Sequence, residues 1–150
     1  MSAFNIVLAL HNIIRWIVVI GGLIAALRAI YGWLAGRPWR ALDNQLGLLF
    51  TVSMDIQALL GLLLYVVLSP ITTSSFSDIG GAMSDPGARF YLVEHIAAMF
   101  VALVLAHAGR SLAKRAKDDK GKHMRAAIFF TIAMLLVLAL IPWNRPLLPG

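Results

Sequence analysis

Residues 8–22 read LALHNIIRWIVVIGG, an apolar run that is interrupted by His11 and, one helical turn later, by Arg15. The run belongs to a longer apolar segment, residues 5–34, which exceeds the roughly 20 residues that a helix needs to cross the hydrocarbon core of a bilayer. An imidazole and a guanidinium are costly inside a membrane and usually have a specific partner there. The stretch therefore predicts a membrane helix that carries a functional or structural site.

The composition of the whole chain also indicates a membrane protein. Of its 150 residues, 60% are hydrophobic and only 13% are charged, and the mean hydropathy is +0.82; a soluble domain would be roughly a quarter charged. Three further apolar segments, residues 46–69, 89–112 and 125–143, are long enough to span a bilayer. We therefore expect residues 1–150 to form a single transmembrane domain, an all-α four-helix bundle embedded in the lipid bilayer.

The basic residues predict the orientation of this bundle. Ten of the thirteen Lys and Arg residues lie in or beside the two loops at residues 35–45 and 113–124, whereas only Arg89 and Arg145 lie near the opposite ends of the spans. Cytoplasmic loops carry an excess of Lys and Arg, so we expect both loops in the cytoplasm and both termini on the outer side. The same grouping argues against nucleic-acid binding as the meaning of the net charge of +6.

Two classes of feature are missing from the sequence. The chain contains no cysteine, which excludes disulfides, thiolate metal sites and cysteine nucleophiles. The N-terminal residues lack the basic region of a secretory signal, so we expect the first span to be a mature helix rather than a cleaved peptide.

His11 and His95 are the candidate metal ligands. Each lies six residues from the outer start of its predicted span, so both are expected at a depth of roughly 9 Å. Two imidazoles at one depth on different helices match the axial ligation of a single b-type haem. The alternative for each is a structural histidine that is hydrogen-bonded to the protein.

Gly22 and Arg15 complete the predicted cofactor site. Gly22 lies nearly in line with His11 on one helical face, and its small size would leave space for a macrocycle, although small residues in membrane helices more often just allow close packing. Arg15 shares a face with His11 and would approach a haem propionate or pair with Asp55, the carboxylate in the middle of the second span. We favour the Arg15–Asp55 ion pair, which could be structural or carry protons.

The remaining ionisable residues of the spans receive weaker predictions. Glu94 lies beside His95 and Arg89 at the outer mouth, where it is a candidate for an ion pair or for proton uptake. His107 lies twelve residues from His95 and on another helical face, so it cannot join the same site. His123 falls in the basic segment KDDKGKHMR, where we expect it to be solvated or to contact lipid headgroups. These positions support one haem at most.

The motifs resemble a group of small four-helix bacterial membrane proteins labelled cytochrome b. The shared patterns are H-x-x-x-R-W (His11 to Trp16), R-F-x-x-x-E-H (Arg89 to His95), K-H (Lys122, His123) and a closing I-P-W (Ile141 to Trp143). The expected architecture is also similar to that of cytochrome b561-type proteins, which hold haem between facing helices and exchange electrons with quinones. This chain departs from them because it lacks a second histidine pair. The resemblance implies a location in the bacterial cytoplasmic membrane.

Two functions therefore remain as hypotheses. The first is a b-type cytochrome that carries electrons through one bis-histidine haem near the outer face and exchanges them with quinone or a partner redox protein, rather than an enzyme in its own right. The second is a haem-free accessory or assembly subunit of a larger respiratory or photosynthetic complex, in which both histidines are structural.

Overall fold

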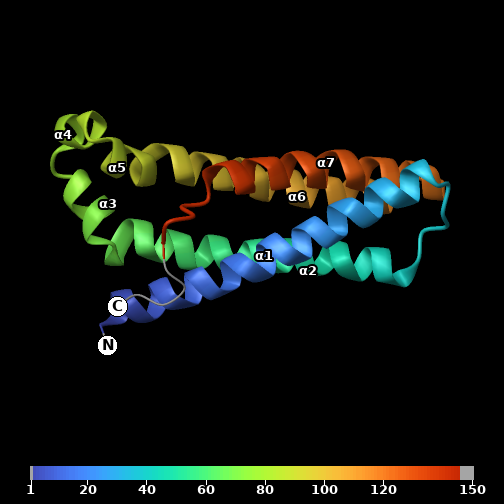
Figure 1. Cartoon of the computed structure of the whole chain (residues 1–150), viewed down its shortest axis with the longest axis horizontal. Coiled ribbons are helices and arrows are strands. Elements are labelled where there is room, and N and C mark those ends of the chain that lie inside the picture. The colour runs from blue at the N-terminus through green and yellow to red at the C-terminus, as the bar shows by residue number, and fades with distance from the viewer. Residues whose placement is uncertain (1, 146–150) are drawn as a thin grey trace.

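Four long helices run along the computed structural model, which describes residues 2–145 (Figure 1). The first is α1 (Ala3–Leu34), and the second is α2 (Ala41–Leu63), which continues as the π-helix η1 (Leu64–Leu68). The third runs from α5 (Pro86–Arg89) through the π-helix η2 (Phe90–Glu94) into α6 (His95–Arg115), and the fourth is α7 (Asp119–Leu140). All four are long and apolar enough to cross a membrane, which confirms the predicted multi-pass, all-α architecture.

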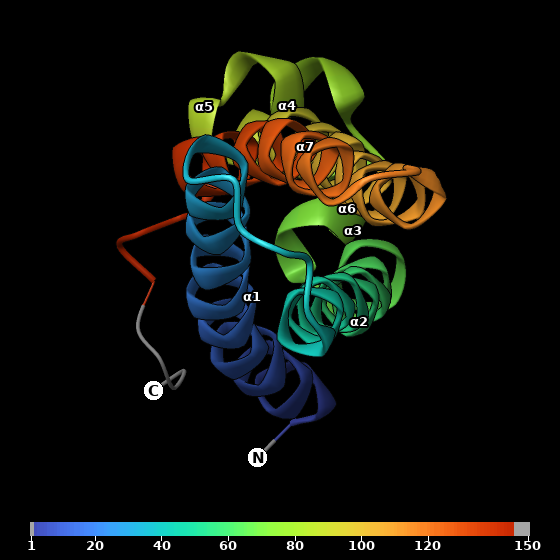
Figure 2. The same ribbon diagram turned by 90° about the vertical axis from the view of Figure 1, so that its right-hand side faces the viewer.

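The helices form a bundle in which α1 and α6 are diagonal neighbours. Helix α1 packs against α2 and α7, and α6 packs against the same two helices. Figure 2, which looks along the bundle, shows α1 and α6 on opposite sides with α2 and α7 between them. A residue of α1 and a residue of α6 can therefore face each other only across the interior.

Small and aromatic residues fill the interior. Ala102, Ala106 and Ala126 are fully buried, and residues of this size let helix backbones approach closely. Phe50 of α2 and Phe130 of α7 meet edge to face with their ring centroids 5.4 Å apart. The contact between α6 and α7 is the most extensive among the described elements, whereas less of the α2 and α6 spans is buried than of the α1 and α7 spans.

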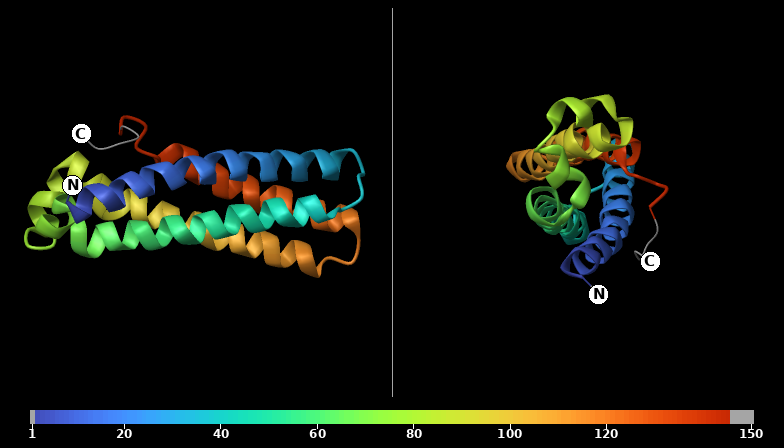
Figure 3. Two further views of the ribbon diagram at one scale, coloured as in Figure 1. Left: turned by 90° about the horizontal axis from the view of Figure 1, so that it is seen from below. Right: turned by 90° about the vertical axis from the view of Figure 1, so that its left-hand side faces the viewer.

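The two ends of the bundle differ (Figure 3). One end, which we call the basic end, holds the connection at residues 35–40 and the turn at residues 116–118. The other, which we call the terminal end, holds the start of α1 and three short helices: α3 (Pro70–Ser75), α4 (Ile79–Ser84) and α5. Met1 and residues 146–150 of the predicted domain lie outside the described residues.

The basic-end loops are shorter than the sequence indicated. The second span begins at Ala41 rather than residue 46, because the Asp43 carboxylate accepts hydrogen bonds from the Arg40 N–H (2.7 Å) and from Arg28 Nε (2.6 Å). The fourth begins at Asp119 rather than residue 125, because the Asp118 side chain accepts from the Gly121 N–H at 2.6 Å. Such caps satisfy the free N–H groups of a first helical turn. The last helix ends at Leu140, just before Pro142, rather than at residue 143.

Candidate functional site

A cavity of about 270 Å³ lies inside the bundle in the half nearer the terminal end. Residues of all four long helices line it, among them His11, Gln57, His95 and Val137. Its volume is close to the lower end of the range for small-molecule sites, about 300–1,000 Å³. Leu62 of α2 and Phe100 of α6 also line it and are themselves largely exposed, so they form its rim on the side between these two helices.

His11 and His95 both line this cavity. They come from the diagonal helices α1 and α6 and line the same cavity from its two sides. His95 Nδ1 is 2.8 Å from the carbonyl oxygen of Leu140, a hydrogen bond in which the ring nitrogen donates. That bond fixes the ring and leaves Nε2 as the nitrogen with a free lone pair, the arrangement found in histidines that ligate metals.

Several polar atoms around the cavity have no hydrogen-bond partner among the described residues. They are His11 Nδ1, Gln57 Oε1 and Arg15 Nε, all of them buried. Buried polar atoms are normally paired, so each unpaired one calls for a water, an ion or a ligand at that place. The cavity therefore presents donor and acceptor groups that the protein itself leaves unsatisfied.

The charge around the cavity is positive. Arg15 and Arg145 line it, whereas no carboxylate does so among the described residues. Arg145 Nε donates to the hydroxyl of Tyr91 at 2.9 Å, and the same guanidinium lies 5.2 Å from the centre of that ring. A ligand that combines an apolar body with anionic groups would complement this lining.

The predicted ion pair of Arg15 with Asp55 is wrong. The Arg15 guanidinium instead donates to the carbonyl oxygens of Pro142 (3.4 Å) and Arg145 (3.5 Å), beyond the end of α7. Both carbonyls lie in the non-helical segment that follows Leu140, where a backbone oxygen keeps a lone pair for a second donor. The other proposed role of Arg15, contact with an anionic group of a cofactor, is compatible with its place on the cavity.

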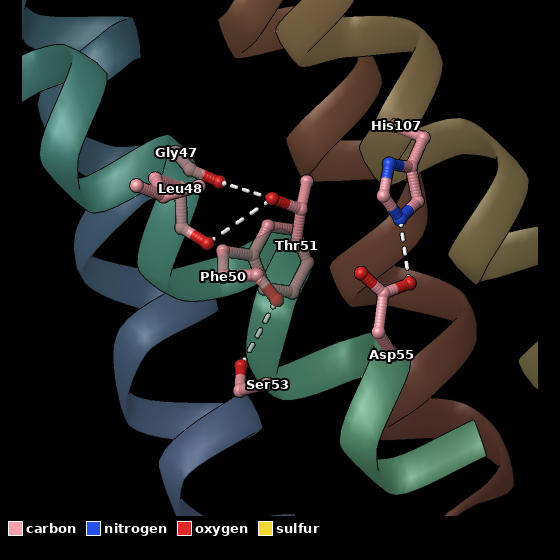
Figure 4. A network of polar contacts seen from close by, with 7 residues as sticks. All are labelled: Gly47, Leu48, Phe50, Thr51, Ser53, Asp55 and His107. Carbon is pink, nitrogen blue, oxygen red and sulfur yellow. Dashed lines mark hydrogen bonds and ion pairs between the residues drawn. The ribbon is translucent and has the colours of Figure 1, made fainter. Parts of the chain in front are cut away.

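Asp55 and Glu94 do form ion pairs, but with other partners. Asp55 Oδ1 is 2.7 Å from Nε2 of His107, a residue to which the sequence assigned no place in the site. Figure 4 shows this contact joining α2 and α6, and neither residue lines the cavity. Glu94 Oε1 accepts from Arg89 Nε at 2.8 Å, as their proximity in sequence suggested.

Gly22 does not line the cavity, contrary to its predicted role. A Cβ at this position would lie 2.6 Å from Phe50 Cε2 and would overlap Met134, so Gly22 serves the close packing of α1 on α2 and α7. The glycine that makes room for a site residue is Gly61 of α2, where an added Cβ would lie 3.2 Å from His11 Cε1. Sequence spacing along α1 could not reveal a glycine on another helix.

His123 is buried, so the prediction that it is solvated or contacts lipid headgroups is wrong. Its exposed fraction is 1%, its ring centroid lies 4.8 Å from that of Trp39, and it occupies the space that a side chain on Gly32 would need. The cause is the early start of α7, which places this residue inside the helix instead of in a loop.

Two π-helical turns flank the cavity, and the sequence did not predict them. Tyr65 of η1 and Tyr91 of η2 line it, and the Tyr65 hydroxyl donates to the carbonyl oxygen of Leu92 at 2.9 Å, which ties the two turns together. Thr72 Oγ1 donates to the carbonyl of Tyr65 at 2.7 Å. Single π-turns within helices occur frequently at functional sites.

The described residues contain no group of three or more His, Cys, Asp or Glu side chains that could hold a metal ion, so metal binding here would depend on the two histidines alone. Comparisons with models of known families, with curated proteins and with solved structures find no match. The function is therefore argued from the cavity.

Proposed function

We propose that this protein is a membrane b-type cytochrome that holds one haem in the cavity between α1, α2, α6 and α7. The observation that carries the proposal is that His11 and His95, from diagonal helices, line one cavity. Two neutral imidazoles are a sufficient axial ligand set for haem iron.

The residues around the cavity fit the chemistry of this cofactor. His95 is held by the Leu140 carbonyl with Nε2 left free, and His11 has an unpaired ring nitrogen. Arg15 and Arg145 supply positive charge that suits the two carboxylates of a haem. The apolar lining, for example Met54 and Met99, suits a hydrophobic ring.

A bound haem would supply one-electron redox chemistry. With both axial positions taken by histidine, the protein would leave no open position for oxygen or another ligand, so electron transfer rather than catalysis follows. The role of His11 and His95 is to hold the iron and to set its potential, and the arginines offset the charge of the carboxylates. Quinone or a redox subunit is the partner class we propose for the exchange of electrons.

We also propose the orientation and location that the basic residues favour. The basic end, with Arg37, Lys117 and Lys120, would face the cytoplasm of a bacterial cell, and the cavity would lie in the outer half of the cytoplasmic membrane. The resemblance to small bacterial proteins labelled cytochrome b supports the same placement.

The test is the absorption spectrum of the purified protein after expression with an adequate supply of haem. We expect a dithionite-reduced minus oxidised spectrum with a sharp b-type α-band and about one haem per chain by pyridine haemochrome assay. His11→Ala and His95→Ala should each abolish the band while the protein still inserts into the membrane. His107→Gln is the matched control, because His107 lies outside the cavity lining and should leave the band intact.

A flat spectrum from folded wild-type protein would overturn the proposal. It would favour the haem-free accessory subunit of a larger respiratory or photosynthetic complex, the second candidate. The hydrogen bond from His95 to the Leu140 carbonyl favours the accessory subunit, because it already gives this histidine a structural partner. Loss of the band in His107→Gln, with retention in His11→Ala, would show that the ligands are misassigned.

A further inference from the structure

The ion pair between Asp55 and His107 lies on the outside of the bundle and within the membrane spans. Asp55 is fourteen residues from Ala41 and thirteen from Leu68, so it is roughly 20 Å from either end of its span. The side chains of Asp55 and His107 are 47% and 48% exposed. In a bilayer, that exposed area faces hydrocarbon unless another protein covers it.

An ion pair in contact with lipid tails is an unusual arrangement. Ionisable side chains within membrane spans almost always face a protein interior or a water-filled cavity, because hydrocarbon cannot solvate them. The two helices that carry this pair, α2 and α6, are also the spans least buried by the rest of the chain. The exposed pair therefore calls for a polar partner on the same face.

The pair retains hydrogen-bonding capacity of both kinds. The contact uses Oδ1 of Asp55 and Nε2 of His107, and Oδ2 and Nδ1 make no hydrogen bond among the described residues. In the charged pair Oδ2 accepts and Nδ1 donates. An acceptor and a donor side by side form a self-complementary patch, since a two-fold axis beside them brings each acceptor opposite the donor of a second copy.

We propose that the chain forms a two-fold symmetric dimer through the exposed face of α2 and α6, with Asp55 and His107 of each copy facing His107 and Asp55 of the other. Apolar residues one turn away, such as Val52, Leu59 and Val104, are largely exposed on these helices and would pack around the polar centre. The proposal rests on the ion pair, neither residue of which lines the cavity, and does not depend on haem.

The first test uses disulfide cross-linking in the membrane, which is clean because the chain has no cysteine. The single-cysteine variants Leu59→Cys and Val104→Cys are reconstituted in proteoliposomes at low protein density, each alone and as a mixture of the two. Their cysteines are then oxidised. We expect a covalent dimer from at least one combination, since a disulfide forms when the Cα atoms approach within about 7 Å. Leu135→Cys on α7 is the control, because it is as exposed (62%) as Leu59 (68%) but lies on another helix, and it should stay monomeric.

The second test replaces each residue of the ion pair by its partner's residue type. The molecular mass of differently tagged chains in nanodiscs then shows whether they are monomers or dimers. Asp55→His and His107→Asp chains should each lose most of the dimer, because one presents two imidazoles and the other two carboxylates. Co-expressed, they should recover a mixed dimer, because each then meets the opposite charge. The cross-linking variants keep Asp55 and His107, so they test dimerisation even if Asp55→His or His107→Asp fails to fold.

Three results would overturn the proposal. One is wild-type protein that stays monomeric in lipid with no cross-link above the Leu135→Cys control. Another is a dimer that survives both single exchanges unchanged. The third is cross-linking to a different membrane protein in place of a second copy, which would show that Asp55 and His107 are buried against that protein.

Discussion

His123 is the most deeply buried of the four histidines, yet neither of its ring nitrogens has a hydrogen-bond partner among the described residues. Its position depends on Gly32, because a side chain there would occupy the same space. A buried polar group without a partner costs about 1–3 kcal/mol, so packing against Trp39 and α1 must offset that cost.

Gly32→Ala should therefore destabilise the bundle by about 1–3 kcal/mol, because the added methyl group forces the His123 ring out of place. The effect should shrink in the background of His123→Ala, where the space is free, and the difference between the two backgrounds measures the contact. Denaturant unfolding of the four proteins in detergent provides the values. Equal stability of Gly32→Ala and wild type would show that the His123 ring does not pack there.

The π-turn η1 ends the second span, and the π-turn η2 lies near the start of the third. The Tyr65–Leu92 hydrogen bond links them, and the Thr72 hydroxyl holds the Tyr65 carbonyl, so three short pieces of chain share one polar connection beside the cavity. No residue pattern indicates the π-turns, because they arise where one extra residue is accommodated to satisfy packing and hydrogen bonding.

Tyr65→Phe should remove the hydrogen bond to Leu92 and lower the free energy of unfolding by about 0.5–1.5 kcal/mol. It should also speed hydrogen exchange of the amides in Phe90–Glu94, since the tie between the two π-turns is lost. Tyr31→Phe is the control: its hydroxyl accepts from Arg37 at an exposed site, where a substitution usually changes stability by less than about 0.5 kcal/mol. Unchanged exchange in η2 would show that the bond does not hold the turn.

At the scale of the whole molecule, the proposed orientation rests on the separation of charge between the ends. The basic end carries the loops rich in Lys and Arg, and the terminal end carries Asp78 and Asp85, which cap the short helices α4 and α5. Positive charge on one side of an apolar bundle favours retention of that side in the cytoplasm.

The orientation predicts opposite labelling of two single-cysteine variants. Ser77→Cys, in the exposed segment between α3 and α4, should react with a membrane-impermeant maleimide in intact spheroplasts. Lys117→Cys, exposed at the basic end, should react only after the membrane is permeabilised. The absence of native cysteine removes background labelling. The reverse pattern would place both termini in the cytoplasm and contradict the orientation.

The number of spans and, within a few residues, their ends can be predicted from the sequence alone, because about 20 apolar residues must be contiguous to cross a bilayer. The sequence also predicted His11 and His95 at one depth, since the rise per residue of a helix is fixed. These properties follow from position along a single helix, and no knowledge of the neighbouring helices is needed to derive them.

The contacts between residues of different helices could not be predicted in this way. The direction in which each helix faces depends on packing between helices, so the sequence could not show that Asp55 pairs with His107, that Gly61 rather than Gly22 adjoins a site histidine, or that His123 is buried. Arg15 illustrates the same limit: its partners are carbonyls beyond the end of α7, and backbone carbonyls carry no signature in a sequence.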